Sequence, residues 1–131
     1  MMFMDKVVHF EIPFEDKKRA MEFYKKLFGW KLNDMPEMNY VIVHTGEVDK
    51  KQMLKEKGTI NGGMMQKREE PGTVIVMSVN SIDKHVKKAE SMGAKVAMPK
   101  IKVGDMGYNA RIIDTEGNLI GLWENIPQKK K

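Results

Sequence analysis

The chain has 131 residues, a formal net charge of +5 and no cysteine. This length suits one domain with a sizeable core, and the lack of cysteine excludes disulfides and thiolate metal sites. The N-terminal apolar run is too short for a signal peptide, and no run approaches the ~20 apolar residues of a membrane span, so we expect a cytoplasmic protein without a membrane partner. Lys129–Lys131 supply much of the excess charge, and no basic stripe carries interleaved aromatics, so we expect no nucleic-acid partner.

The first half of the chain predicts a strand, a helix and three further strands. A helix is expected over residues 16–28, where apolar side chains recur at helical spacing. Glu15 or Asp16 can cap its start, and Gly29 suits its end. The expected strands cover residues 7–12, 30–33, 39–45 and 60–67, with a polar, lysine-rich connection over 46–58.

The second half predicts the same order of elements after a turn at 69–72. A helix is expected over residues 81–92, with Asn80 as its cap and Gly93 after its end. The segment Asp114–Asn118 is typical of a tight hairpin turn, and Gly107 is expected in a turn as well. The expected strands cover residues 74–79, 94–98, 107–113 and 118–123.

The two halves therefore read as copies of one unit. Gly93 follows Gly29 by 64 residues, close to half of the chain, and each glycine separates a helix from a strand of the pattern Gly-x-Lys-(Leu/Val). A duplicated unit of this size buries its apolar face against its twin and leaves a cleft between sheets. We predict one α+β domain over residues 1–131, with modules at roughly 5–69 and 73–126.

Three motifs connect this pattern to a known family. They are His9-Phe10-Glu11-Ile12-Pro13, Phe23-Tyr24 before Phe28-Gly29-Trp30, and Asp114-Thr115-Glu116-Gly117-Asn118 before the last strand. In this order they resemble the glyoxalase/bleomycin-resistance/dioxygenase superfamily, the vicinal oxygen chelate proteins, and most closely its small glyoxalase-related members. The resemblance covers nearly the whole chain. It implies two βαβββ modules related by a pseudo-twofold axis, curved mixed sheets around a cleft, and a homodimer.

The resemblance also locates the positions at which metal-dependent members bind a divalent ion. Those members use His, Gln or Glu side chains from the first and last strands of each module. His9 matches the first position. The other positions are occupied by Val74, by Gly121 and by one of Gly62 and Gly63, none of which can bind an ion through its side chain. We therefore expect no metal cofactor, because one histidine alone holds an ion only weakly.

Strand alternation indicates which side chains face the cleft. His9 and Glu11 share one face of their strand, so if one faces the cleft the other does too. A carboxylate in a partly apolar cleft must be paired or poised for proton transfer. The candidate catalytic residues are Glu11 and His9, and the candidate ligand-binding residues are Trp123, Tyr108, Met64 and Gly121. Each residue also has a purely structural interpretation. His9 can be a hydrogen-bonded core histidine and Glu11 an ion-paired glutamate. Trp123, Tyr108 and Met64 can be ordinary packing residues, and Gly121 can allow close approach of another backbone.

The leading functional hypothesis is a glyoxalase-like protein that binds a small organic molecule in the cleft without an intact metal site. One alternative is a lyase, isomerase or dioxygenase that uses a divalent metal held by fewer or unrecognised ligands. A second alternative is a metal-free enzyme with Glu11 as general base and His9 assisting. A structural dimer with a vestigial cleft is the third. Fold-level analogy alone does not choose among them.

Overall fold

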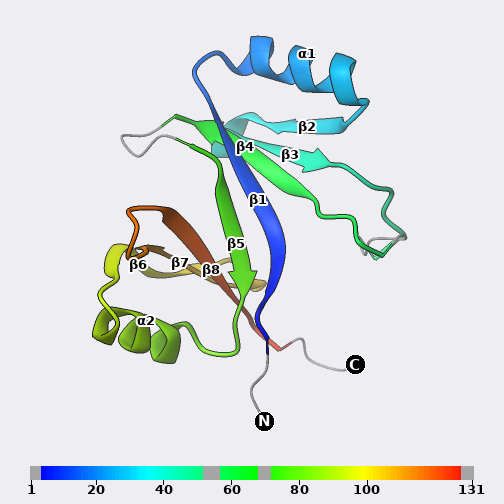
Figure 1. Ribbon diagram of the computed structural model, residues 1–131. Helices are drawn as coiled ribbons and strands as arrows, with labels where there is room; N and C mark the ends of the chain where they lie inside the picture. The colour runs from blue at the N-terminus through cyan, green and yellow to red at the C-terminus, as the bar shows by residue number, and fades with distance from the viewer. Residues whose placement is uncertain (1–3, 52–56, 68–71, 128–131) are drawn as a thin grey trace. The chain divides into compact units, whose positions relative to one another are not determined.

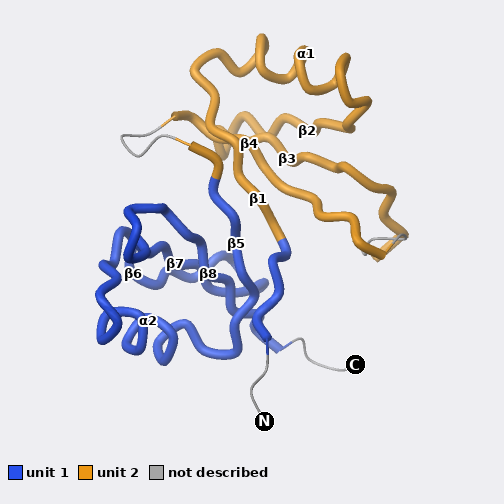
Figure 2. The backbone as a smooth tube through the Cα atoms, in the orientation of Figure 1, with its two compact units in different colours: residues 1–8, 74–131 blue, residues 9–73 orange. Residues whose placement is uncertain are grey.

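The computed structural model describes residues 4–51, 57–67 and 72–127. Its elements follow the order strand, helix, three strands twice over (Figure 1). The chain divides into two compact units, unit 1 with residues 1–8 and 74–131 and unit 2 with residues 9–73 (Figure 2). Most of the expected turn at 69–72, part of the 46–58 connection and the C-terminal lysines lie outside the described residues.

Unit 2 is a four-stranded mixed sheet with one helix. Its elements are β1 (Lys6–Phe14, of which Lys6–Val8 falls in unit 1), α1 (Lys17–Phe28), β2 (Lys31–Met35), the short 3-10 helix η1 (Pro36–Met38), β3 (Tyr40–His44) and β4 (Gly62–Gln66). The strand order is β2-β3-β4-β1. The β1–β4 pair is parallel, and the β2–β3 and β3–β4 pairs are antiparallel.

Unit 1 repeats this arrangement. Its elements are β5 (Val74–Ser78), α2 (Ile82–Ser91), β6 (Lys95–Val103), β7 (Gly107–Ile113) and β8 (Leu119–Asn125). The strand order is β5-β8-β7-β6, with a parallel β5–β8 pair and antiparallel β7–β8 and β6–β7 pairs. First and last strands of each unit are thus parallel neighbours, which confirms the predicted pair of βαβββ modules.

Strand β6 is longer than expected. The sequence predicted an end at Met98, just before Pro99, which lacks the N–H that a sheet ladder needs. The strand instead continues to Val103, with register shifts between Val96 and Met98 and between Met98 and Ile101. Proline is tolerated there because β6 is the outermost strand of unit 1 and pairs only with β7 within that unit.

Both helices are capped by side chains. Helix α1 starts where the Asp16 carboxylate accepts a hydrogen bond from the Arg19 N–H at 3.0 Å, and it ends at Gly29, whose φ of 72° is left-handed. Helix α2 is capped by Ser81, whose side chain accepts from the Lys84 N–H at 3.2 Å. The expectation of an Asn80 cap is wrong, because Asn80 lies one residue too early to reach the first turn.

Replacing Ser81 by alanine is expected to lower the free energy of unfolding by about 0.5–2 kcal/mol, the usual cost of losing an N-cap. The exposed Asn80 is the matched control, and Asn80→Ala should change stability by less than about 0.5 kcal/mol. Urea unfolding of both variants measures the two values. An Asn80 effect equal to that of Ser81 would contradict the assignment of the cap.

The core of unit 2 lies between its sheet and α1. Phe14, Val41, Val43 and Met64 are buried there. Helix α1 covers this face with Ala20, Met21 and Tyr24, as its position alongside the sheet in Figure 1 illustrates. The opposite face of the sheet carries no helix of unit 2, and it holds the residues of the candidate site.

Unit 1 is built on the same plan. Its buried cluster joins Ile82 of α2 to Val79, Ala110 and Leu122. The expected turn at 114–118 is confirmed: the Asp114 carboxylate accepts from the Glu116 and Asn118 N–H groups, both at 2.8 Å. These bonds hold the pKa of Asp114 below its usual value, with the bonds from Asn118 contributing most.

Gly107 is not the turn residue that the sequence suggested. It is the first residue of β7, and a Cβ on it would overlap the Trp123 ring and approach the Glu124 carbonyl oxygen to 2.5 Å. Gly107 therefore makes room for Trp123.

Among the described residues, no helix is long and apolar enough to cross a bilayer.

Candidate functional site

A cluster of three polar side chains lies on the helix-free face of unit 2. His9 and Glu11 extend from the same face of β1, as alternation predicted, and Tyr40 reaches them from the start of β3. The Tyr40 hydroxyl lies 2.9 Å from His9 Nε2 and 3.1 Å from Glu11 Oε2. Tyr40 thus joins the two predicted residues into one cluster, which we call the His9–Tyr40–Glu11 site.

The chemistry of the partners fixes the direction of these hydrogen bonds. The Tyr40 hydroxyl has one hydrogen, which it donates to the Glu11 carboxylate. Its oxygen therefore accepts from His9, so Nε2 of His9 carries a proton. The direct separation of His9 Nε2 and Glu11 Oε2 is 3.8 Å, which is too long for a hydrogen bond. Tyr40 therefore connects His9 to Glu11 through two hydrogen bonds.

The site is partly sheltered from water. The side chain of Glu11 is 11% exposed and that of His9 is 34% exposed. A carboxylate as buried as Glu11 needs hydrogen-bond donors to offset its lost hydration, and Tyr40 supplies one. His9 remains open enough to meet a ligand from solvent, so the cluster combines a sheltered anion with an accessible imidazole.

Glycine at position 63 makes this arrangement possible. Strand pairing sets Gly63 opposite Glu11 on β1 and opposite Ile42 on β3, so it lies in the same face of the sheet as the site. A Cβ on Gly63 would overlap the Tyr40 hydroxyl. The Tyr40 side chain therefore fills the space directly above Gly63.

Gly62 serves the opposite face. It pairs with Phe10, and a Cβ on it would approach the Phe10 carbonyl oxygen to 2.5 Å and the Phe10 ring to 2.7 Å. The sequence left open which glycine corresponds to the superfamily ligand position. Of the two, only Gly63 lies on the face of His9 and Glu11.

The residues at the superfamily's ligand positions do not fit a divalent metal ion. Position 63 has no side chain, and the space above it is taken by Tyr40. Gly121, on β8, has none either, and a Cβ there would meet Val76 at 2.8 Å. Within the described residues, no group of three or more His, Cys, Asp or Glu side chains is arranged to hold a metal. These positions therefore lack the donor atoms that a catalytic metal ion needs.

The other predicted site residues lie elsewhere. Met64 is fully buried in the core of unit 2, beneath α1. Gly121 and Trp123 share the face of unit 1 opposite α2, where the Trp123 indole donates to Asn125 Oδ1 at 2.7 Å. That either residue contacts a ligand stays a prediction.

Tyr108 does not share a wall with Trp123. Strand pairing sets Tyr108 opposite Glu124 and Asn109 opposite Trp123, so the two aromatic side chains lie on opposite faces of the sheet. Tyr108 packs against the buried cluster of unit 1, and the Lys100 Nζ lies 4.5 Å from the centre of its ring. The pKa of Lys100 is raised, chiefly by its hydrogen bond to Asp83.

Sequence reasoning missed Tyr40. Its strand was expected, and alternation there separates Tyr40, Ile42 and His44 from the core residues Val41 and Val43. Nothing local indicated that Tyr40 would reach His9, which lies 31 positions away. The only signal was a glycine pair inside a strand, which indicates that a neighbouring group approaches closely.

Comparison with known proteins agrees with this fold. Residues 6–46 match the family model described as bleomycin resistance protein-like N-terminal. CFP32 of Mycobacterium tuberculosis, which is provisionally called a glyoxylase, is 28% identical over 113 residues, or 83% of this chain. The chain spans only 41% of the length of that relative.

Solved structures give the same result. Methylmalonyl-CoA epimerase from Mycobacterium tuberculosis matches with a TM-score of 0.61 at 17% identity, covering 97% of this chain and 94% of the epimerase. A glyoxalase/bleomycin resistance protein/dioxygenase superfamily member from Vibrio splendidus matches with a TM-score of 0.62 at 13% identity, covering 94% of this chain and 100% of that one. The chain has the fold of that superfamily, and the resemblance seen in its motifs is confirmed.

Proposed function

We propose that this protein binds a small organic molecule at the His9–Tyr40–Glu11 site and does so without a bound divalent metal ion. The observation that carries the proposal is at position 63 of β4. This residue is a glycine, and the Tyr40 hydroxyl fills the space that a side chain there would occupy. A hydroxyl linked to a carboxylate and an imidazole offers a ligand hydrogen bonds and charge, but it is a poor substitute for a metal-binding set.

A second candidate is a metal-free enzyme in which Glu11 acts as general base. The hydrogen-bonded chain from His9 through Tyr40 to Glu11 favours it, because such a chain can deliver or accept a proton at either end. The structural match to an epimerase makes a proton transfer at carbon the reaction class to test first. Under this hypothesis, Glu11→Gln abolishes turnover while binding is largely kept, since glutamine preserves shape and an acceptor oxygen.

The metal-free part of the proposal is tested by incubating the protein with Zn²⁺, Ni²⁺ or Mn²⁺, dialysing it and measuring metal content. We expect far less than one ion per chain, because His9 Nε2 is engaged by Tyr40 and the other ligand positions lack donors. One retained ion per chain that disappears in His9→Ala would overturn this expectation.

The binding part is tested by ligand-observed NMR with small organic acids and methylmalonyl-CoA, on wild type and three variants. Glu11→Gln and Tyr40→Phe should each weaken any specific ligand by roughly tenfold or more, the effect of a hydrogen bond to a charged group. The control is Tyr24→Phe, because Tyr24 lies on α1 beneath the other face of the sheet. Ligands that bind all variants equally would place the binding surface elsewhere.

A further inference from the structure

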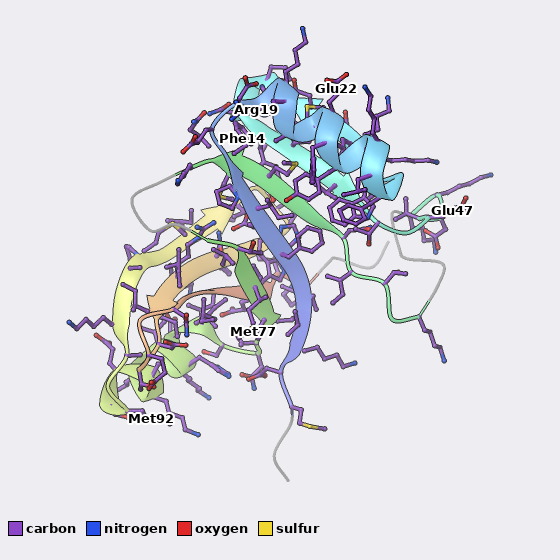
Figure 3. All side chains as sticks on the ribbon, turned by 45° about the horizontal axis from the view of Figure 1, so that its top comes forward. Phe14, Arg19, Glu22, Glu47, Met77 and Met92 are labelled. Carbon is purple, nitrogen blue, oxygen red and sulfur yellow. The ribbon has the colours of Figure 1, made fainter. Side chains whose placement is uncertain are left out.

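A cavity beside α1 lies on the other side of unit 2. It occupies about 590 Å³ between α1 and the start of β2, on the side of the sheet that α1 covers. Its apolar lining includes Met21, Trp30 and Leu32, all of which pack against the unit 2 core. Its outer wall includes Glu22, which Figure 3 labels on α1. The cavity is therefore separate from the His9–Tyr40–Glu11 site.

The Trp30 ring in the apolar wall of this cavity is held in place by other aromatic rings. The Trp30 ring stacks on Tyr24 with centroids 5.3 Å apart and an interplanar angle of 5°. Phe28 and Phe10 support the same ring at centroid distances of 5.2 and 5.8 Å. Because three aromatic neighbours fix Trp30, a planar ligand could pack beside it without first ordering the side chain.

The rim of the cavity is positively charged. Lys18 and Lys25 lie seven residues apart along α1, on one stripe of the helix, and Lys31 begins β2. Among the described residues, none of these lysines has an ion-pair partner. The one acidic residue of the lining, Glu22, pairs instead with Lys26 at 3.2 Å. The rim therefore presents three cations that no acidic group in the described part of the chain neutralises by pairing.

Two smaller cavities beside α1 lack this combination. One is lined by Arg19 and Lys26 together with Glu22 and offers no tryptophan. The other contains Glu15 and Asp16 against a single arginine. Of these three cavities, only the one at Trp30 joins a tryptophan held by aromatic neighbours to an excess of lysines.

We propose that the cavity between α1 and β2 binds a flat aromatic organic anion, a ring system bearing a carboxylate or a phosphate. The ring packs against Trp30, Met21 and Leu32, where it buries apolar surface. The anionic group lies among Lys18, Lys25 and Lys31, whose charges offset its loss of hydration. This site is independent of the function proposed for the helix-free face.

The test follows the indole N–H signal of Trp30 by two-dimensional NMR during titration. The chain has two tryptophans, so the signal that persists in Trp123→Phe belongs to Trp30. The probes are 2-naphthoate, 2-naphthyl phosphate, the neutral 2-naphthylmethanol and inorganic phosphate. We expect saturable shifts with the aromatic anions, and affinity at least about threefold weaker for the neutral alcohol and for inorganic phosphate. The first two probes distinguish a carboxylate from a phosphate ligand.

Charge variants locate the site. Lys18→Gln and Lys25→Gln should each weaken the better aromatic anion by up to about fivefold, and the double variant by more. Arg19→Gln is the matched control, because Arg19 is an exposed cation of α1 that does not line this cavity. Tyr40→Phe should leave this binding unchanged, which separates the outcome from that of the proposed function.

Three results would overturn the proposal. They are no saturable shift of the Trp30 signal with either aromatic anion, equal affinity for the neutral alcohol, and equal losses in Arg19→Gln and Lys25→Gln. The lysines are exposed, so folding of the variants is not in question.

Discussion

Met64→Ala is expected to lower the free energy of unfolding by about 2–5 kcal/mol, the range for deleting a large buried side chain. Met64 is completely buried among Phe14, Val41 and Val43, beneath α1. Truncation removes its apolar contacts and leaves a cavity that the surrounding strands cannot fully close. Because a domain of this size is stable by only about 5–15 kcal/mol, the variant should unfold at clearly lower denaturant.

Urea unfolding measures this effect, with Met38→Ala as the control. Met38 is 64% exposed in η1, so its truncation should change stability by less than about 0.5 kcal/mol. A Met64 variant as stable as the Met38 variant would show that Met64 is not a core residue. It would then return as a candidate for ligand contact.

Gly63→Ala is expected to break the His9–Tyr40–Glu11 site while the strands remain paired. The added methyl group overlaps the Tyr40 hydroxyl, so the ring must rotate away and its hydrogen bonds to His9 and Glu11 are lost. Overpacking of this kind costs about 1–3 kcal/mol, and each lost hydrogen bond adds about 1 kcal/mol. Ligand binding at the site should fall together with stability.

A double-mutant cycle separates this clash from a general cost of alanine in β4. In a Tyr40→Ala background there is no ring for the methyl group to strike, so Gly63→Ala should cost at least about 1 kcal/mol less than in wild type. Equal costs in the two backgrounds would mean that Gly63 is required for a reason other than Tyr40. The ligand-binding loss of Gly63→Ala should also match that of Tyr40→Phe.

The chain has the superfamily's fold, but the residues at the expected ligand positions differ from a metal-binding set. His9, which the motif resemblance aligns with the first ligand position, is hydrogen-bonded to Tyr40. The positions that would complete a metal-binding set include two glycines whose space is taken by Tyr40 and Val76. Side chains thus pack over Gly63 and Gly121, and His9, Tyr40 and Glu11 form a hydrogen-bonded chain on one face of a sheet.

The order of elements was determined by the sequence itself. Apolar spacing of 3.6 residues identified both helices, Gly29 marked the end of α1 and Glu15 or Asp16 its start, and the Asp114–Asn118 turn was recognisable from its residue types. Alternation along β1 placed His9 and Glu11 on one face without knowledge of any partner strand. These features depend on contacts within a few residues, so local sequence carries them.

Only the tertiary structure decided the partners of those residues. Whether Tyr40 meets Glu11 depends on the β1–β4 and β3–β4 registers, which are set by pairing between strands far apart in sequence. The same applies to Tyr108, which the β7–β8 register turns away from the face of Trp123. A shift of one residue moves every side chain of a strand to the other face, so alternation fixes faces within a strand, and strand pairing alone fixes them between strands.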